Sequence, residues 1–412
     1  MKLAINGGEP VRKKKFKAYN TVGVAEKEAA NRVLNRGVLS GFLGSWDESQ
    51  FFGGLEVKNF EALWSNRFSA RHSISVNSAS SAIQIALKAI GIGVGDEVIV
   101  SPYSMSVSAS APLMWGAIPI FADIDPNHYN ITPESIKSKI TAKTKAIVVV
   151  HILGCPADMD EIMQIAKESN IAVIEDASQA PGATYKGKSV GALGDIGIFS
   201  LNVHKHIQAG EGGVCVTNSD ELALRLQLLR NHSEAVIEAM GRLDLRDMYG
   251  FNFRITELQA AIAASQLENR LDTELAVRRK YAKIYDDALT KFDFMETTIV
   301  NEREHAYYVQ GFRYHQDRTG VRREKFIDAV CAELDVVEGY ESDGVQIWGG
   351  YVKPLYRLPV FGNTDIYLPV VEDMYSNKLV LHDFTKSSLD ISDVEDVVEA
   401  YQKVCSNIDE LR

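Results

Sequence analysis

The middle of the chain alternates between two patterns of hydrophobic and polar positions. Six short runs are apolar almost throughout, which is typical of strands that are buried on both faces of a parallel sheet. They are EVIVSPY (97–103), IPIFADI (118–124), AIVVVHI (146–152), AVIEDA (172–177), IGIFSL (196–201) and GGVCVTN (212–218). Between them, apolar residues recur at every third or fourth position, which predicts amphipathic helices. These helices are SAIQIALKAIGI (81–92), PADMDEIMQIAKESN (156–170) and SDELALRLQLLRN (219–231). The alternation predicts an α/β domain with a mostly parallel sheet.

The pattern changes after residue 250. ITELQAAIAASQLENRL (255–271) and the charged run behind it predict long helices that lead out of the α/β domain. A strand signal at 307–314, helices at 323–334 and 393–405, and a proline-rich loop at 352–361 then indicate a smaller α+β domain. A chain of 412 residues is long enough for two domains, since single cores stop growing at roughly 250 to 300 residues. We expect a large domain over 1–250, including the N-terminal segment, and connecting helices with a small domain over 251–412.

The charge and composition of the chain limit the kinds of molecule that it is expected to bind. A formal net charge of −11 argues against the broad basic surface that nucleic acid or an acidic membrane requires. No apolar run approaches the roughly 20 residues that span a bilayer, and the first residues contain no apolar signal core. The four cysteines lie far apart without Cys-x-x-Cys spacing, so they suggest neither a zinc site nor a disulfide framework. We expect a cytoplasmic protein that binds small molecules, without a metal.

Polar residues follow the predicted strands at the edge where an open parallel sheet binds ligands. Asp176 and Gln179 come after one strand, and Ser200 and Lys205 come after another. The segment NSASS (77–81) precedes the first long helix, where free backbone N–H groups and the helix dipole favour an anion such as phosphate. Taken singly, each of these polar residues has a simpler explanation, because Ser and Asn are common helix caps and aspartates are common in loops.

Lys205 lies in IFSLNVHKHIQAGEGGVCVTN (198–218), between two histidines and before Gly-Glu-Gly-Gly. A lysine amine can form a Schiff base with a carbonyl when it lies among apolar or cationic groups. Taken alone, a solvated loop lysine followed by a glycine turn is the commoner explanation. The groups expected at neighbouring strand ends are an anion-binding helix start, a carboxylate, a hydroxyl and an amine. This combination suits the binding of pyridoxal phosphate. A carboxylate such as Asp176 keeps a ring nitrogen protonated.

In this combination the chain resembles the DegT/DnrJ/EryC1/StrS sugar aminotransferases, pyridoxal-phosphate enzymes of fold type I in the aspartate aminotransferase superfamily. The resemblance covers nearly the whole chain and is strongest from Val76 to Leu267. It rests on GIGVGDEVIV, IPIFADIDPNHYNITPESI, TKAIVVVHILGCPADMDEI, VIEDASQAPGATYKGKSVGALGDIGIFS, KHIQAGEGGVCVTN and GFNFRITELQAAIAASQL, in the family's order and spacing. It implies a large α/β domain and a smaller C-terminal α+β domain.

Position by position, the resemblance implies roles for individual residues. Lys205 forms the Schiff base with the cofactor and carries protons, Asp176 pairs with the pyridine nitrogen, and Gln179 lies beside the ring and its 3-oxygen. The phosphate is held by the following residues of the same subunit: Ala79, Ser80 and Ser200. Asn252 reaches the phosphate in the partner subunit, so the active unit is expected to be a homodimer with shared sites.

Three positions depart from the family pattern. Met105 stands where an aromatic residue usually stacks on the ring, and a thioether packs on a π face more loosely; Tyr103 is the alternative. Ser200, Leu201 and Asn202 replace the usual Ser-Phe-His, which leaves the role of Asn202 open. Ala79-Ser80 replaces Gly-Thr and keeps the hydroxyl.

The expected reaction is transfer of an amino group from glutamate or glutamine to a keto sugar. Relatives that dehydrate sugars have histidine in place of the lysine, so Lys205 favours transamination. Nucleotide-linked 4-keto or 3-keto sugars rank first as acceptors. The opening LAINGGEPVR resembles members that aminate inososes or make aminohydroxybenzoate, so a cyclitol or another small ketone is the alternative. The loop Gly41–Gly54 and the segment SDGVQIWGGYVKP (342–354) are expected to shape this choice. A regulator that binds the cofactor without turnover is a further alternative, against which the retained Lys205 argues.

Overall fold

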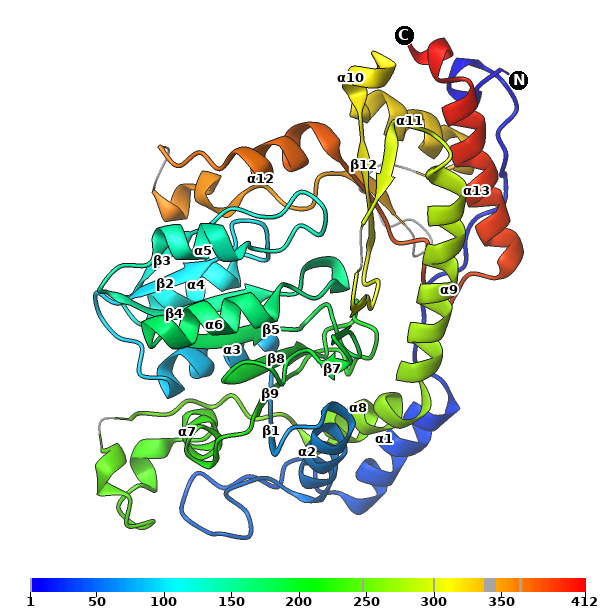
Figure 1. Cartoon of the computed structure of the whole chain (residues 1–412). Coiled ribbons are helices and arrows are strands. Elements are labelled where there is room, and N and C mark those ends of the chain that lie inside the picture. The colour runs from blue at the N-terminus through cyan, green and yellow to red at the C-terminus, as the bar shows by residue number, and fades with distance from the viewer. Residues whose placement is uncertain (1, 247, 299–300, 337–345, 363–364) are drawn as a thin grey trace.

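A seven-stranded sheet forms the centre of the larger part of the molecule (Figure 1). The computed structural model describes residues 2–246, 248–298, 301–336, 346–362 and 365–412. The strands are β1 (His72–Val76), β2 (Glu97–Val100), β3 (Ile118–Phe121), β4 (Thr144–Val150), β5 (Ala172–Asp176), β8 (Ile196–Ser200) and β9 (Gly213–Thr217). Their order is β1-β9-β8-β5-β4-β2-β3. β9 runs antiparallel to both neighbours, and all other pairs are parallel. The prediction of a mostly parallel sheet is confirmed.

All six apolar runs form strands of this sheet, and the sequence pattern missed only β1. β1 reads His-Ser-Ile-Ser-Val, an alternation of polar and apolar residues instead of a continuous apolar run. It lies at the edge of the sheet and pairs with β9 alone. Its two serines are buried all the same, because Ser73 Oγ lies 2.8 Å from Ser65 Oγ and Ser75 donates to Glu61, so a buried strand lacks the continuous apolar run.

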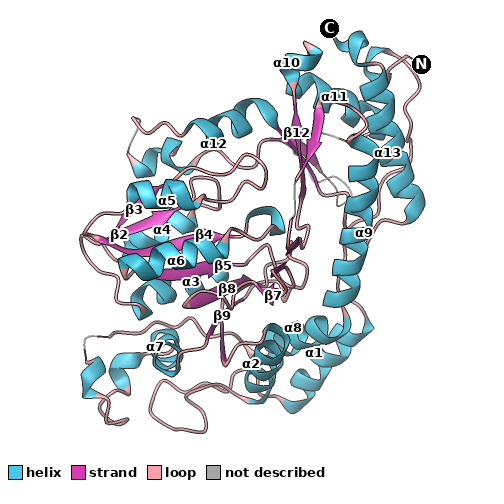
Figure 2. Ribbon diagram, in the orientation of Figure 1, coloured by secondary structure: helices cyan, strands magenta, loops and turns pink. Residues whose placement is uncertain are grey.

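Helices cover both faces of this sheet (Figure 2). Val98 and Ile99 are consecutive in β2 and point into two different cores, as the two-residue repeat of a strand requires. The core that contains Val98 also contains side chains of α3 (Ala79–Ala89), α4 (Val107–Met114) and α7 (Asp220–Arg230). The core that contains Ile99 is formed with α2 (Leu55–Phe68), α5 (Pro133–Lys139), α6 (Met159–Ser169) and α8 (Glu257–Asn269). α1 (Val24–Arg36) packs on α8.

The C-terminal part of the chain is built around a second, antiparallel sheet of order β10-β12-β14-β13. Its strands are β10 (Met295–Thr297), β12 (Gln310–Tyr314), β13 (Ile347–Gly349) and β14 (Leu379–His382). The helices in this part of the chain are α9 (Leu271–Leu289), α10 (Gln316–Thr319), α11 (Arg323–Leu334), α12 (Pro369–Asp373) and α13 (Ile391–Ser406), of which α12 packs on the core of the large sheet through Val371. A small three-stranded sheet joins β11 (Arg303–Glu304) to β6 (Thr184–Tyr185) and β7 (Lys188–Ser189). The prediction of a smaller α+β unit agrees with this arrangement.

Two segments cross between the two parts. Leu3 and Phe16 belong to the core of the C-terminal unit, where Arg12 also forms an ion pair of 2.8 Å with Asp393. In the other direction, Leu355 packs into the core of the large sheet. The division at residue 250 stays a prediction, and the N-terminal segment contacts the C-terminal unit. No helix of the described ranges is both long and apolar enough to cross a membrane.

Candidate active site

A cavity of about 340 Å³ opens at the carboxyl ends of β5 and β8. Seven of the eight residues that the sequence singled out line it, together with Asn202 and Glu211. The seven are Ala79, Ser80, Met105, Asp176, Gln179, Ser200 and Lys205. They come from the start of α3, from two neighbouring strands and from three loops, as parallel strands that end at one edge require. The size is that of a small-molecule site.

Lys205 lies on the loop between β8 and β9, and its Nζ lies 4.2 Å from the centre of the Tyr308 ring. His206 beside it is fully buried and donates from Nε2 to the carbonyl of Ala306, 2.8 Å away. Burial lowers the pKa of His206 to about 3, so this imidazole is neutral at physiological pH. The Lys205 amine thus lies over the face of Tyr308 in the cavity, and the histidine beside it in the chain is uncharged at physiological pH.

Asp176 is the last residue of β5 and is 5% exposed. Its Oδ1 accepts a hydrogen bond of 3.0 Å from the N–H of Ser178. The preceding Glu175 points to the other face of the strand and is paired there with His151 at 3.0 Å. The alternation along β5 therefore separates a structural carboxylate from one that faces the cavity.

The first turn of α3 forms another wall of the cavity through Ala79 and Ser80. Ser78 caps the helix by accepting from the N–H of Ser81 at 3.0 Å, and the N–H groups before Ser81 have no partner within the helix. Gly213, the last residue of Gly-Glu-Gly-Gly, lies against this turn, because a Cβ at Gly213 would stand 2.6 Å from the nitrogen of Ala79. The glycine lets β9 approach the helix start closely.

Two other positions that depart from the family pattern, Met105 and Asn202, have well-defined neighbours. Met105 lines the cavity and is 54% exposed, whereas Tyr103 is fully buried outside it and accepts a hydrogen bond from the N–H of Tyr351. Of the two, Met105 is the one that reaches the cavity. Asn202 donates from Nδ2 to Glu211 at 3.1 Å and accepts from the N–H of His204, so it holds the lysine loop together.

Asn252 lies outside the cavity. It is exposed, forms an antiparallel bridge with Asn231, and accepts a hydrogen bond of 2.8 Å from Arg254. The loop Gly41–Gly54 lies beside it, since Asn231 donates from Nδ2 to the carbonyl of Leu43. Neither segment lines the cavity of its own chain.

Sequence reasoning missed two tyrosines. Tyr308 and Tyr351 both line the cavity, and Gln179 donates from Nε2 to the Tyr351 hydroxyl at 2.8 Å. Tyr308 lies just before β12, in a run that indicated only a strand, while Tyr351 lies in a segment that was expected to shape substrate choice. Residues 342–345 of that segment lie outside the described residues. Trp348 and Gln346, with Tyr308 and Tyr351, line an adjoining cavity of about 210 Å³.

The family model of the DegT/DnrJ/EryC1/StrS aminotransferases matches residues 42–402. The chain belongs to this family. GDP-perosamine synthase of Caulobacter vibrioides is 34% identical over 360 residues, which cover 85% of this chain and 90% of that enzyme. An L-glutamine:2-deoxy-scyllo-inosose aminotransferase of Micromonospora echinospora is 31% identical over 427 residues and covers 100% of this chain and 99% of its own. The crystal structure of an aminotransferase from Psychrobacter cryohalolentis superposes with a TM-score of 0.84 at 30% identity, and covers 96% of this chain and 100% of that one.

DegT/DnrJ/EryC1/StrS aminotransferases depend on pyridoxal phosphate, and the fold is that of a fold type I enzyme. The residues of the cavity fit this cofactor. The start of α3 offers N–H groups for a phosphate, and Gly213 leaves the room that a Cβ would fill. Asp176 supplies a buried carboxylate and Lys205 an amine. The described residues contain no group of three or more side chains that could hold a metal ion.

Proposed function

We propose that this aminotransferase transfers an amino group from glutamine or glutamate to the ring ketone of a sugar or cyclitol, with Lys205 as the catalytic residue. The supporting observation is the convergence of Lys205, Asp176, Ser200 and the start of α3 on one cavity. These groups come from elements that are far apart in the sequence, and together they match the amine, carboxylate and phosphate-binding groups that the cofactor needs. A regulator could bind the phosphate without an amine that reaches the cofactor, so the retained Lys205 supports turnover.

Each residue has a distinct task in this reaction. Bound pyridoxal phosphate withdraws electrons from the substrate carbon that loses a proton. The Nζ of Lys205 takes that proton and returns it at the other end of the transfer. Asp176 keeps the ring nitrogen protonated, since a buried carboxylate favours a cation beside it. Ser80 at the start of α3 and Ser200 would hold the phosphate, and Met105 and Gln179, which line the same cavity, would contact the ring.

We further propose that the active unit is a homodimer in which Asn252 reaches the phosphate in the partner subunit. Asn252 is exposed and lies away from its own cavity. Val38, Leu39 and Leu43 in the loop before α2 are exposed apolar residues, and the carbonyl of Leu43 accepts from Asn231, which is the bridge partner of Asn252. Exposed apolar side chains of this kind are typical of a surface that another protein covers. The loop Gly41–Gly54 would then border the partner's site.

The acceptor has two candidates. A nucleotide-linked keto sugar is supported by the similarity to GDP-perosamine synthase. An inosose is supported by the relative from Micromonospora echinospora, which aligns with this chain from end to end. The adjoining cavity of about 210 Å³, with Trp348 and two tyrosines, supplies aromatic faces on which either ring could pack.

A spectroscopic experiment tests the function. Purified protein loaded with pyridoxal phosphate is expected to show the absorption band of the lysine-bound cofactor. Glutamine or glutamate should convert this band to that of the aminated cofactor, and the correct acceptor should restore it. The panel should contain nucleotide-linked 4-keto and 3-keto hexoses, free inososes and simple cyclic ketones. Failure of both donors to change the band would contradict the proposal, and restoration by one acceptor identifies the substrate.

A further inference from the structure

The turn after β4 has an unfavourable backbone that needs outside support. Ile152–Gly154 forms a short 3-10 helix in which Leu153 has φ 59° and Gly154 has φ 95°. Leu153 is a large, fully buried residue in the left-handed region, which side chains with a Cβ rarely adopt. A Cβ at Gly154 would stand 2.8 Å from the carbonyl oxygen of Gln179. Such conformations persist only where the surroundings hold them.

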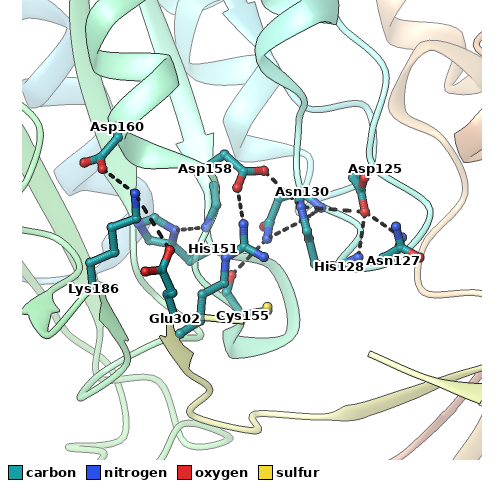
Figure 3. Close-up of polar contacts among 12 residues, drawn as sticks. Asp125, Asn127, His128, Asn130, His151, Cys155, Asp158, Asp160, Lys186 and Glu302 are labelled. Atoms are coloured by element: carbon teal, nitrogen blue, oxygen red, sulfur yellow. Dashed lines mark hydrogen bonds and ion pairs between the residues drawn. The ribbon is translucent and has the colours of Figure 1, made fainter. Parts of the chain in front are cut away.

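Asn130 holds both ends of this turn. It is 1% exposed and lies on the loop between β3 and α5, next to His128 and Cys155 (Figure 3). Its Oδ1 accepts from the N–H of Ile152 at 2.9 Å, and its Nδ2 donates to the carbonyl of Cys155 at 3.0 Å. The first partner is only a donor and the second only an acceptor. The orientation of the Asn130 amide is therefore determined by its partners.

A second layer supports Asn130. Its Nδ2 lies 3.3 Å from Nδ1 of His128, whose Nε2 lies 3.0 Å from Asp158 Oδ2. Asp158 is also paired with Arg303 of β11. With the histidine proton on Nε2, both contacts of the ring are satisfied, and Nδ1 accepts from Asn130.

The turn at residues 152–154 orients the side-chain amide of Gln179. The N–H of Leu153 donates to Gln179 Oε1 at 2.6 Å, so the Nε2 of Gln179 must point the other way, where it donates to the Tyr351 hydroxyl. Gln179 is 4% exposed and lines the cavity. A reversed amide would place two N–H donors against each other at Leu153. The direction of the Gln179 N–H groups thus depends on the position of Leu153.

We propose that Asn130 is a positioning residue of the active site, which acts through the turn at residues 152–155 to aim the Gln179 amide at the edge of the cofactor ring. This inference rests on the proposed function for its catalytic consequence. The contacts from Asn130 to the turn, and from the turn to Gln179, do not depend on the cofactor. Asn130 itself does not line the cavity, so any effect of its replacement on the cofactor must pass through the turn.

Two double-mutant cycles test the proposal with Asn130→Ala, Gln179→Ala and the double variant. The first cycle measures urea unfolding of the cofactor-free protein. The second follows the pH midpoint of the absorption band in protein loaded with pyridoxal phosphate. An N–H donor beside the 3-oxygen of the ring stabilises its negative charge and weakens its hold on a shared proton, so loss of that donor should raise the midpoint, by about 0.5 to 1 pH unit.

We expect the double variant to lose less free energy of unfolding than the two single variants lose together. Both single variants should raise the pH midpoint of the absorption band, and the double variant should raise it no further. Gln310→Ala is the matched control. Gln310 is a buried amide that bridges α9 and β14 outside the cavity, and its loss should lower stability with the midpoint unchanged. If Asn130→Ala does not fold, Asn130→Asp replaces it, because this change keeps the acceptor for Ile152 and removes the donor to Cys155.

The proposal would be overturned if the two single variants lose stability in a strictly additive way. It would also be overturned if the Gln179 variant shifts the pH midpoint and the Asn130 variant does not. A wild-type protein that forms no lysine-bound cofactor band would contradict the proposed function instead. The unfolding cycle then still decides whether Asn130 and Gln179 are coupled. The two failures are therefore distinguishable.

Discussion

Gln179 and Tyr351 are separated by 172 residues in the sequence, and their side chains are joined by a hydrogen bond of 2.8 Å. Gln179 follows β5 of the large sheet, and Tyr351 follows β13 of the C-terminal sheet. Burial raises the pKa of the Tyr351 hydroxyl, so it stays protonated and able to accept from Gln179 at physiological pH. The cavity is thus closed by side chains from both units, and changes in either unit can reach it.

Replacement of Lys205 tests the central assignment. Lys205→Ala should reduce turnover by about 10³-fold or more, since no other amine of this chain lines the cavity among the described residues. The absorption band of the lysine-bound cofactor should disappear, while thermal unfolding changes little because Lys205 is only partly buried. Lys137→Ala, at an exposed position of α5, is the control and should keep both activity and band. Full turnover in Lys205→Ala would exclude the lysine as the catalytic group.

The two carboxylates at the end of β5 should have different roles: Asp176 should support turnover, and Glu175 should support the stability of the fold. Asp176→Asn keeps the shape but removes the charge beside the ring nitrogen, and should lower turnover by about 10²-fold or more with the fold intact. Steady-state kinetics and circular dichroism measure the two effects.

Glu175→Gln is the matched comparison for this prediction. Glu175 is fully buried and accepts from the N–H groups of Gly191, Leu193 and Gly194. Hydrogen bonds to a buried charge are strong, so the loss should lower the free energy of unfolding by about 2 kcal/mol. Equal kinetic effects of the two substitutions, at equal stability, would contradict the division of tasks.

Gly213→Ala should weaken cofactor binding. The added Cβ would stand 2.6 Å from the backbone nitrogen of Ala79 and must displace the start of α3. Overpacking against backbone costs about 1 to 3 kcal/mol, which corresponds to an increase of about 5-fold to 150-fold in the Kd for pyridoxal phosphate. Gly93→Ala serves as the control, because the nearest atom to its Cβ would be 4.0 Å away. Unchanged affinity in Gly213→Ala would show that α3 does not bind the phosphate.

Asp286 predicts a pH dependence of stability. Burial raises the pKa of this carboxyl to about 6 from the ordinary value of 3.8, although Gln310 donates to it at 2.8 Å. The folded protein therefore binds the proton more tightly than the unfolded chain does. The stability that this group contributes is present below pH 3.8 and is lost as the pH rises through about 6.

Asp286→Asn removes the buried charge and should raise the free energy of unfolding by about 3 kcal/mol at pH 8, with little change near pH 4. Urea unfolding at the two pH values measures the difference. Asp287→Asn, at the exposed neighbouring position, should have a small effect at both. A stabilisation that is larger at pH 4 than at pH 8 would have the wrong sign.

Local sequence determined the layered α/β fold and much of the candidate site. Continuous apolar runs and helical repeats indicate which residues are buried on one or both faces, and parallel strands end at a common edge, so Asp176, Gln179, Ser200 and Lys205 could be grouped from their positions alone. β1 escaped this reasoning because its apolar residues alternate with serine and histidine.

Only the tertiary structure decided which distant segments meet at that edge. Tyr308 and Tyr351 reach the cavity from the C-terminal unit. Leu3 and Phe16 of the N-terminal segment pack into the core of that same unit. Asn130 supports a turn that no local sequence pattern indicates. The physical reason is that contacts between residues far apart in the chain depend on how whole elements pack. Hydrophobic periodicity reports which face of an element is buried, but it does not report the partner against which that face is buried.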